Sequence, residues 1–93
     1  MIVGVLRADV HLPDAASLKD KRSVLKSVKD RLRGQFNLAV AEVDATEKWQ
    51  RATLGIVTVG DDRRYVDGCL SHVDAWLHEQ RGLVVLQVEQ ELL

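Results

Sequence analysis

The sequence predicts one α+β domain spanning residues 1–93, with its elements in the order strand, helix, strand, strand, helix, strand. Three observations support this prediction. In four segments apolar residues alternate with polar ones, which is typical of strands that bury one face. In two longer segments apolar residues recur every three or four positions, which is typical of amphipathic helices. A length of 93 residues suits one two-layer core, with room for further burial in an oligomer.

The first strand is predicted over residues 1–12, because apolar side chains recur there with a period of two. Pro13 ends the run, since proline has no N–H group to donate to a neighbouring strand. The face toward the core would carry Ile2, Leu6, Ala8, Val10 and Leu12. The opposite face would carry Val3, Val5, Arg7, Asp9 and His11.

The first helix is predicted to begin at Ser17 and to end before Gly34. The Ser17 hydroxyl can accept a hydrogen bond from the first helical turn, and Asp20, three residues later, is a variant of the second half of a capping box. One side of this helix is apolar and comprises Leu18, Val24, Leu25, Val28 and Leu32. We therefore expect this side to pack on the sheet.

Residues 37–45 and 50–60 alternate again and are separated by only a few residues around the turn. So short a connection favours an antiparallel hairpin over a crossover. Glu42 and Asp44 are expected to point the same way on the first of these strands. Because Arg51 returns within cross-strand reach, we expect an ion pair that fixes the hairpin register, and catalysis by the two carboxylates is a weaker alternative.

The second helix is predicted to begin at Asp61 or Asp62, whose carboxylate can cap it, and Gly82 is the expected stop. Its apolar side comprises Val66, Leu70, Val73 and Leu77. The last strand is predicted over residues 83–92. Two helices and four strands in this order are typical of the ferredoxin-like βαββαβ sandwich, in which both helices cover one face of a four-stranded antiparallel sheet.

This arrangement leaves the other face of the sheet open. On that face we expect Val3, Val5, Arg7, Asp9, His11, Thr53, Val57, Val59, Val85, Gln87 and Glu89. Valine makes up much of the surface, so another chain is expected to cover its apolar end. The sequence therefore predicts a homo-oligomer, and the candidate contact residues are Val3, Val5, Trp49, Val57 and Val85. Trp49 is included because an aromatic ring near a hairpin turn either folds over the sheet edge or anchors a partner.

Other function classes find little support in the sequence. There is neither a membrane-spanning run nor a signal peptide, so we expect a soluble, cytoplasmic protein. Cys69 is the lone cysteine, and His72 and His78 lie about 240° apart around a helix, too far to share a metal ion. The glycines form no phosphate-binding loop. We therefore expect no enzymatic activity, no metal, no cofactor and no small-molecule substrate.

The stretch SLKDKRSVLKSVKDRLRGQFNLAVAEVDATEKWQRATLG resembles the YlxP-like family of small bacterial proteins of unknown function. Its most specific pieces are residues 17–22 (SLKDKR), 36–37 (FN) and 49–51 (WQR). The resemblance implies a ferredoxin-like fold and genes that often lie near those of translation initiation and ribosome-maturation factors; it implies no catalytic residues. Residues 45–47 (ATE) depart from the aromatic or histidine residue with Gln-Asp that is typical of relatives.

The first predicted helix concentrates positive charge. Residues 18–33 carry seven Lys or Arg against two Asp, although the whole chain has a net charge of −1. At 100° per residue, five of these cations share an arc of about 80° that no acidic residue interrupts. We call this set the α-helical stripe; it consists of Lys19, Arg22, Lys26, Lys29 and Arg33. Like charges one turn apart destabilise a helix, so the pattern suggests an external purpose.

Three interpretations of the stripe remain open. It is a solubilising face neutralised by acidic side chains of the same molecule, a surface that follows RNA phosphates, or a docking surface for acidic protein. The first and third predicted strands contain no aromatic residue, which argues against base stacking on the sheet. We therefore expect a non-enzymatic, RNA- or ribosome-associated accessory protein that binds phosphates, and the alternative is an interaction or regulatory homo-oligomer without a nucleic-acid role.

Overall fold

The computed structural model describes residues 1–44 and 47–93, so the departure at positions 45 and 46 lies outside the described residues. Its elements are β1 (Ile2–His11), α1 (Leu18–Gln35), β2 (Ala39–Val43), β3 (Arg51–Gly60), α2 (Arg63–His78) and β4 (Val84–Leu92). The predicted order and the ferredoxin-like α+β fold are confirmed. None of the described helices combines the length and the apolar character needed to cross a membrane.

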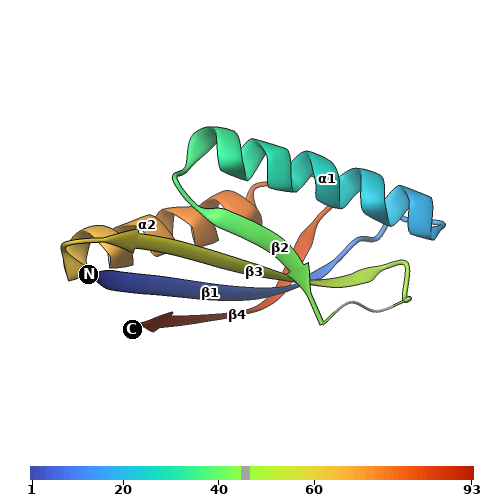
Figure 1. Ribbon diagram of the computed structural model, residues 1–93. Coiled ribbons are helices and arrows are strands. Elements are labelled where there is room, and N and C mark those ends of the chain that lie inside the picture. The colour runs from blue at the N-terminus through green and yellow to red at the C-terminus, as the bar shows by residue number, and fades with distance from the viewer. Residues whose placement is uncertain (45–46) are drawn as a thin grey trace.

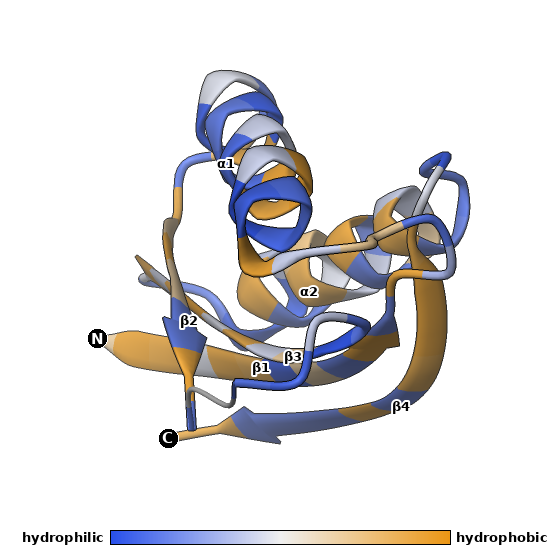
Figure 2. Ribbon diagram, turned by 90° about the vertical axis from the view of Figure 1, so that its right-hand side faces the viewer, coloured by the Kyte–Doolittle hydropathy of each residue, from blue (hydrophilic) through white to orange (hydrophobic). Residues whose placement is uncertain are grey.

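The four strands form one antiparallel sheet in the order β2-β3-β1-β4 (Figure 1). The two long central strands pair over their whole length, from Ile2 opposite Gly60 to His11 opposite Arg51. Both helices lie on one side of the sheet, with α1 over β2 and α2 over β1 and β4 (Figure 2). The opposite side, here called the open face, is not covered by any described element.

Both helices begin where the sequence places their caps. The Ser17 hydroxyl accepts a hydrogen bond from the Asp20 N–H at 3.0 Å, and the Asp20 carboxylate accepts one from the Ala16 N–H at 3.0 Å. Asp62, rather than Asp61, caps α2 and accepts from the Arg64 N–H at 2.8 Å. Such caps satisfy first-turn N–H groups that have no partner within the helix.

The helix ends differ from the prediction. Because Gly34 keeps a helical backbone, α1 continues through it to Gln35. The last residue of α2 is His78, four residues before Gly82, which adopts a φ of +77° in the turn that precedes β4. This left-handed conformation costs glycine nothing, so Gly82 makes the turn rather than ending the helix.

The core fills the space between the helices and the sheet. Its fully buried large side chains are Leu6, Val10, Leu12, Val28, Leu32, Leu54, Ile56, Val66, Leu70, Val73 and Leu77. At one end α2 approaches β1 closely, because a Cβ added at Gly4 would lie 2.6 Å from Val66 Cγ1. Burial of each such side chain stabilises the fold by about 1.5–3 kcal/mol, so these residues dominate the stability of the domain.

The strand β4 contains a bulge that changes the predicted facing of one residue. Gln87 pairs with Asp9, but Val85, rather than Leu86, pairs with Val10. The extra residue shifts the alternation, so Val85 turns toward the helices and packs against the core. The placement of Val85 on the open face is therefore wrong, whereas Gln87 lies opposite the open-face residue Asp9.

Hydrogen bonds of Gln50 join the start of β3 to the connection between β1 and α1. Its carbonyl accepts a hydrogen bond from the Leu12 N–H at 2.9 Å and lies 3.0 Å from His11 Nδ1. Its side-chain amide donates to the carbonyls of Pro13 and Ala15, each at 3.2 Å. These contacts fix the N-terminal approach to α1 and so position the stripe that begins at Lys19.

Candidate nucleic-acid interface

The structure places the whole stripe on the outer side of α1, where it runs along most of the helix. Lys29 is half-buried at its stem, and the other four members are exposed. The buried side of the same helix carries Leu25, Val28 and Leu32, which orient the helix on the sheet. The same apolar periodicity that packs α1 thus directs the five cations outward.

Two members of the stripe have partners within the chain. Lys26 donates to Asp30 Oδ2 at 2.8 Å, and Arg33 Nη1 lies 3.5 Å from Asp30 Oδ1. Arg33 also donates through Nη2 to the Val40 carbonyl of β2 at 3.0 Å, which places this end of the stripe beside the edge of the sheet. One carboxylate therefore serves two cations.

Asp30 is ionised over the whole neutral range. The hydrogen bond from Lys26 lowers the pKa of this carboxylate, and the charges of Lys26, Arg33 and Lys29 lower it further, although partial desolvation opposes them. Because the side chain is exposed, these contacts add little stability. Their consequence is local, since the charges of three stripe residues act on one carboxylate.

The other three members are available to an external anion. Within residues 1–44 and 47–93, Lys19 and Arg22 make no ion pair or side-chain hydrogen bond, and Lys29 acts on Asp30 only through its charge. Arg22 follows Lys19 by three positions and Lys29 follows Arg22 by seven, so their stems leave the same side of the helix. The three cations therefore point the same way along one side of α1.

Lys21 behaves differently from its charged neighbours. This side chain is 3% exposed, its Nζ lies 3.1 Å from Glu42 Oε2, and it donates to the Lys48 carbonyl at 3.2 Å. A buried ammonium group needs such partners because desolvation is costly. Lys21 therefore joins the first turn of α1 to β2 and to the β2–β3 connection.

The predicted ion pair of Glu42 and Asp44 with Arg51 is wrong. Glu42 faces α1 and pairs with Lys21, whereas Asp44 pairs with Arg7 on β1. Asp44 has a φ of +50°, which breaks the strand alternation and turns its carboxylate toward the open face. The Asp44 carboxylate also raises the pKa of Arg7 by its hydrogen bond and its charge. Arg51 instead lies opposite His11 in the sheet.

The predicted oligomer contacts fall in separate places. Val3, Val5 and Val57 lie together on the open face, because Val5 pairs with Val57 and alternates with the buried Leu6. Trp49 is 52% exposed in the connection before β3, at the opposite end of that strand from Val57. Val85 faces the core, as described above. The structure thus brings three of the five residues into one cluster.

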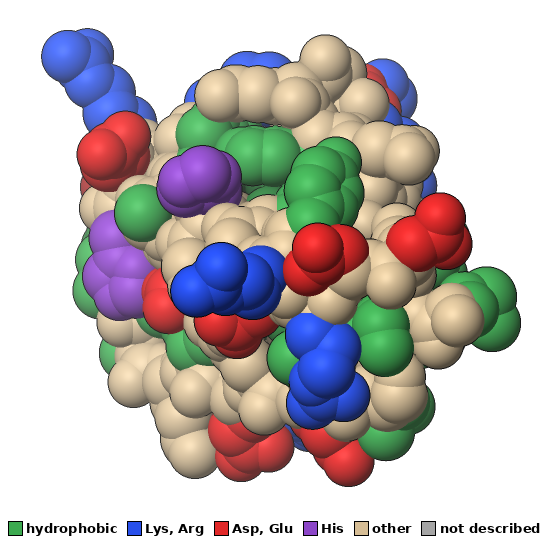
Figure 3. All heavy atoms as spheres, turned by 90° about the vertical axis from the view of Figure 1, so that its left-hand side faces the viewer, with side chains coloured by type: hydrophobic (Ala, Val, Ile, Leu, Met, Phe, Trp, Pro, Cys, Tyr) green, Lys and Arg blue, Asp and Glu red, His purple; other side chains and the backbone are tan. Residues whose placement is uncertain are grey.

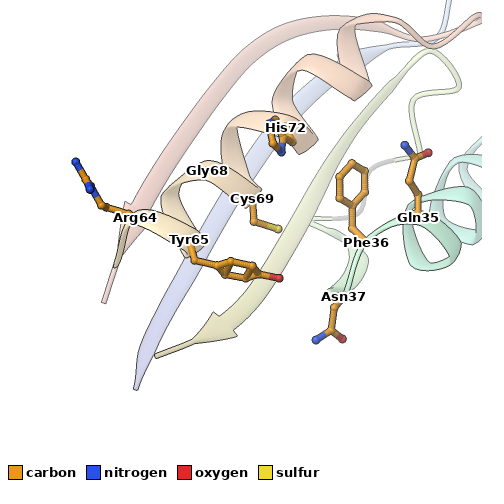
Figure 4. A pocket seen from close by; sticks show the side chains of 8 residues that line it. All are labelled: Gln35, Phe36, Asn37, Arg64, Tyr65, Gly68, Cys69 and His72. Carbon is orange, nitrogen blue, oxygen red and sulfur yellow. The ribbon is translucent and has the colours of Figure 1, made fainter. Parts of the chain in front are cut away.

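A groove at one end of the molecule has no counterpart in the sequence prediction. It lies between the C-terminal end of α1 and the first turns of α2, and its volume is about 370 Å³. We call it the end groove; it is lined by Phe36, Asn37, Tyr65, Gly68, Cys69 and His72 (Figure 4). Cys69, the lone cysteine of the sequence, is half-buried beside the core. The groove escaped prediction because its walls come from segments about thirty residues apart.

These features define the chain as a ferredoxin-like α+β domain with a concentration of cations on α1. Residues 3–90 match the family described as Protein of unknown function (DUF503). The chain is also 33% identical over 76 residues to the uncharacterised protein YlxP of Bacillus subtilis (strain 168), covering 82% of this chain and 83% of that protein. The chain therefore belongs to the DUF503 family, and the resemblance to YlxP-like proteins is confirmed.

Proposed function

We propose that the protein is a non-enzymatic, cytoplasmic RNA-binding accessory that holds a phosphate backbone along α1. The observation that carries this proposal is that most cations of the stripe have no carboxylate partner. Lys19, Arg22 and Lys29 have no carboxylate of the described chain in contact, whereas a solubilising face would pair its charges at one-turn spacing. The association with ribosomes rests on the gene neighbourhood that the YlxP-like resemblance implies.

The sheet supports phosphate contacts over base readout at its surface. RNA-binding sheets of this topology stack bases on aromatic side chains of the two central strands. Here β1 and β3 carry no Phe, Tyr or Trp. Phosphate contacts made by lysine and arginine carry little sequence information, so binding through the stripe is expected to tolerate many sequences.

The experiment compares two charge-reversed variants with the wild type on single-stranded RNA. We expect Arg22→Glu/Lys29→Glu to abolish binding at low salt, because it reverses two of the three cations that have no carboxylate in contact. The control Arg51→Glu/Arg81→Glu changes the net charge equally but lies outside the stripe. For three phosphate contacts, the logarithm of affinity should fall with the logarithm of salt concentration at a slope of about −2 to −3.

Equal loss of binding in both variants would show that only net charge matters and would contradict the proposal. Undiminished binding by Arg22→Glu/Lys29→Glu would contradict it as well. Unfolding midpoints of the two variants serve as the folding control, since all four substituted side chains are exposed or project from a helix surface.

A second candidate function, self-association, is favoured by the open face. Its apolar end exposes Val57 by 39%, Val59 by 51% and Leu93 by 63%. Leu93 belongs to this cluster because it exchanges two backbone hydrogen bonds with Val3, at 2.7 and 3.0 Å. We propose that a second copy of the chain covers this end, since the apolar patch can meet its own symmetry mate.

Size limits the strength of that contact. The strands have 10, 5, 10 and 9 residues. At about 3.4 Å per residue and about 4.8 Å between strands, they span roughly 550 Å², of which the apolar end is less than half. A stable interface buries about 800 Å² on each partner. The open face therefore supports a weak, concentration-dependent dimer rather than an obligate one.

A further inference from the structure

The end groove has the shape of a site for a small planar group. Tyr65 from α2 points across it toward the segment of Phe36 and Asn37, the Phe36 ring stands on the far side, and the Cys69 sulfur lies between the two rings (Figure 4). Hydrophobic side chains border a hollow at this end of the molecule, with a histidine beside it (Figure 3). The volume of about 370 Å³ is at the lower end of the range of ligand pockets.

Its chemistry suits a heteroaromatic ring. Phe36 is held in place by an edge-to-face contact with Trp76, at 6.4 Å between ring centroids, so its position is fixed before any ligand arrives. Tyr65 is exposed and can close on the other side of a flat ring. The amide of Asn37 at the margin supplies both a donor and an acceptor, as the edge of a nucleobase requires.

Gly68 keeps the floor of the groove open. It lies inside α2, where glycine is less favourable than alanine, yet its backbone has no positive φ. A Cβ added there would meet no atom within 4 Å, so close packing does not require glycine. The lack of a side chain at this position instead leaves space beside Tyr65 and Cys69.

The groove begins where the stripe ends. Gln35, the last residue of α1, lines the groove and follows Arg33 by two residues, which is about 3 Å along the helix axis. Arg33, at the end of the stripe, lies beside β2, and the groove opens toward α2. A strand lying on the stripe would therefore turn around the end of α1 to reach the groove, which unpaired RNA is flexible enough to do.

We propose that the end groove receives one unpaired base of an RNA strand whose phosphates lie on the stripe. This inference rests on the proposed function and deepens it, because it adds a contact to the base itself. It assigns stacking to Phe36 and Tyr65 and contacts with the base edge to Asn37. Stacking tolerates every base, so the groove distinguishes unpaired from paired RNA rather than one sequence from another.

The test compares two oligomers of equal length, oligoadenylate and a ribose-phosphate chain without bases. We expect the wild type to bind oligoadenylate about 5- to 150-fold more tightly, the gain that stacking of one base provides. Gly68→Leu fills the groove and should remove this preference, whereas the control Gly68→Ala should retain it. Both variants should bind the base-free chain with the affinity and salt slope of the wild type.

The outcomes separate the two proposals. Equal affinity of the wild type for the two oligomers, or an unchanged preference in Gly68→Leu, would overturn the base site and leave phosphate binding standing. Failure to bind either oligomer at low salt would overturn phosphate binding and the base site together. Unfolding midpoints verify the fold of both variants. A Cβ at position 68 meets no atom within 4 Å, so we expect both to fold.

Discussion

Lys21 and its neighbours on α1 share a residue type but not an environment. Lys19 and Arg22 reach solvent, whereas Lys21 is 3% exposed and pairs with Glu42. The Glu42 side chain is 24% exposed, so the two partners differ in their access to water. Removing the carboxylate takes the anionic contact from a buried ammonium that keeps its hydrogen bond to the Lys48 carbonyl. Removing the ammonium leaves a carboxylate on a side chain that retains partial access to solvent.

We expect Glu42→Gln to lower the free energy of unfolding by about 2–3 kcal/mol, and Lys21→Met to lower it less, because methionine keeps the apolar stem. The double variant Lys21→Met/Glu42→Leu should cost less than Glu42→Gln alone, since it leaves no charge uncompensated. Urea titrations of the three variants provide the measurement. Additive losses in the double variant would contradict a coupled buried pair.

Substitution of Asp30 tests the proposal by an expected gain in RNA affinity, because Asp30 is the carboxylate that forms ion pairs with stripe residues. Asp30→Asn frees Lys26 and removes one of the two contacts of Arg33. We therefore expect tighter RNA binding and a salt slope closer to the value of about −3.5 to −4.5 that five phosphate contacts would give. Fluorescence anisotropy at several salt concentrations measures both quantities. A loss of affinity would contradict a competing role for Asp30.

Sequence reasoning at this scale located the cations but not their partners. The helical periodicity that defines the stripe also places Lys21, at about 300°, in the middle of the apolar side, which signals burial. Its partner Glu42 lies on another element, and only the packing of α1 over β2 brings them together. The positive φ of Asp44 and its ion pair with Arg7 were equally inaccessible, because the two residues are 37 positions apart in the sequence.

At the scale of single elements, the free space beside each glycine shows how closely its neighbours approach. We expect Gly4→Ala to destabilise the fold by about 1–3 kcal/mol, since its Cβ would press on Val66 Cγ1 at 2.6 Å. Gly68→Ala should instead stabilise by about 0.5–1 kcal/mol, because alanine is the better helix former and finds open space. Thermal or urea unfolding of the two variants should shift in opposite directions, and shifts of the same sign would contradict this account.

The strands show where the period-two pattern predicts the facing of side chains correctly and where it does not. Alternation correctly predicted the facing of β1 and β3, because both are long, regular and paired on two sides. In β4 the bulge at Leu86 inserts one residue, and no glycine or proline at the bulge indicates it in the sequence. Every residue before the bulge is therefore turned over, which is why Val85 was misplaced.

For the whole molecule, the open face predicts association that depends on concentration. We expect sedimentation velocity to show a growing dimer fraction between micromolar and submillimolar protein. Val59→Asp should weaken it about tenfold or more, because it places a charge within the apolar cluster. Leu86→Asp is the matched control, since Leu86 is exposed to a similar extent, 49% against 51%, but lies in the bulge of β4. A wild-type monomer throughout this range would contradict the proposed interface.

The overall architecture followed from the sequence because each element carries its own signal: caps at Ser17 and Asp62, two helical periodicities and four alternating runs. The end groove did not, because Phe36 and Tyr65 come to line one groove only after the helices pack on the sheet. A local pattern thus predicts elements and their order, whereas a concave site depends on contacts between them.

The two outer strands also bear on how the protein behaves at high concentration. Arg33 spans from α1 to the carbonyl of Val40 on β2, and the bulge disrupts the regular ladder of β4 at Leu86. Unprotected edge strands can pair with strands of other molecules and lead to fibrils. The Arg33 contact on β2 and the bulge in β4 both hinder this pairing. If a second copy covers the valines of the open face, as proposed, crowded molecules form closed pairs rather than open-ended polymers.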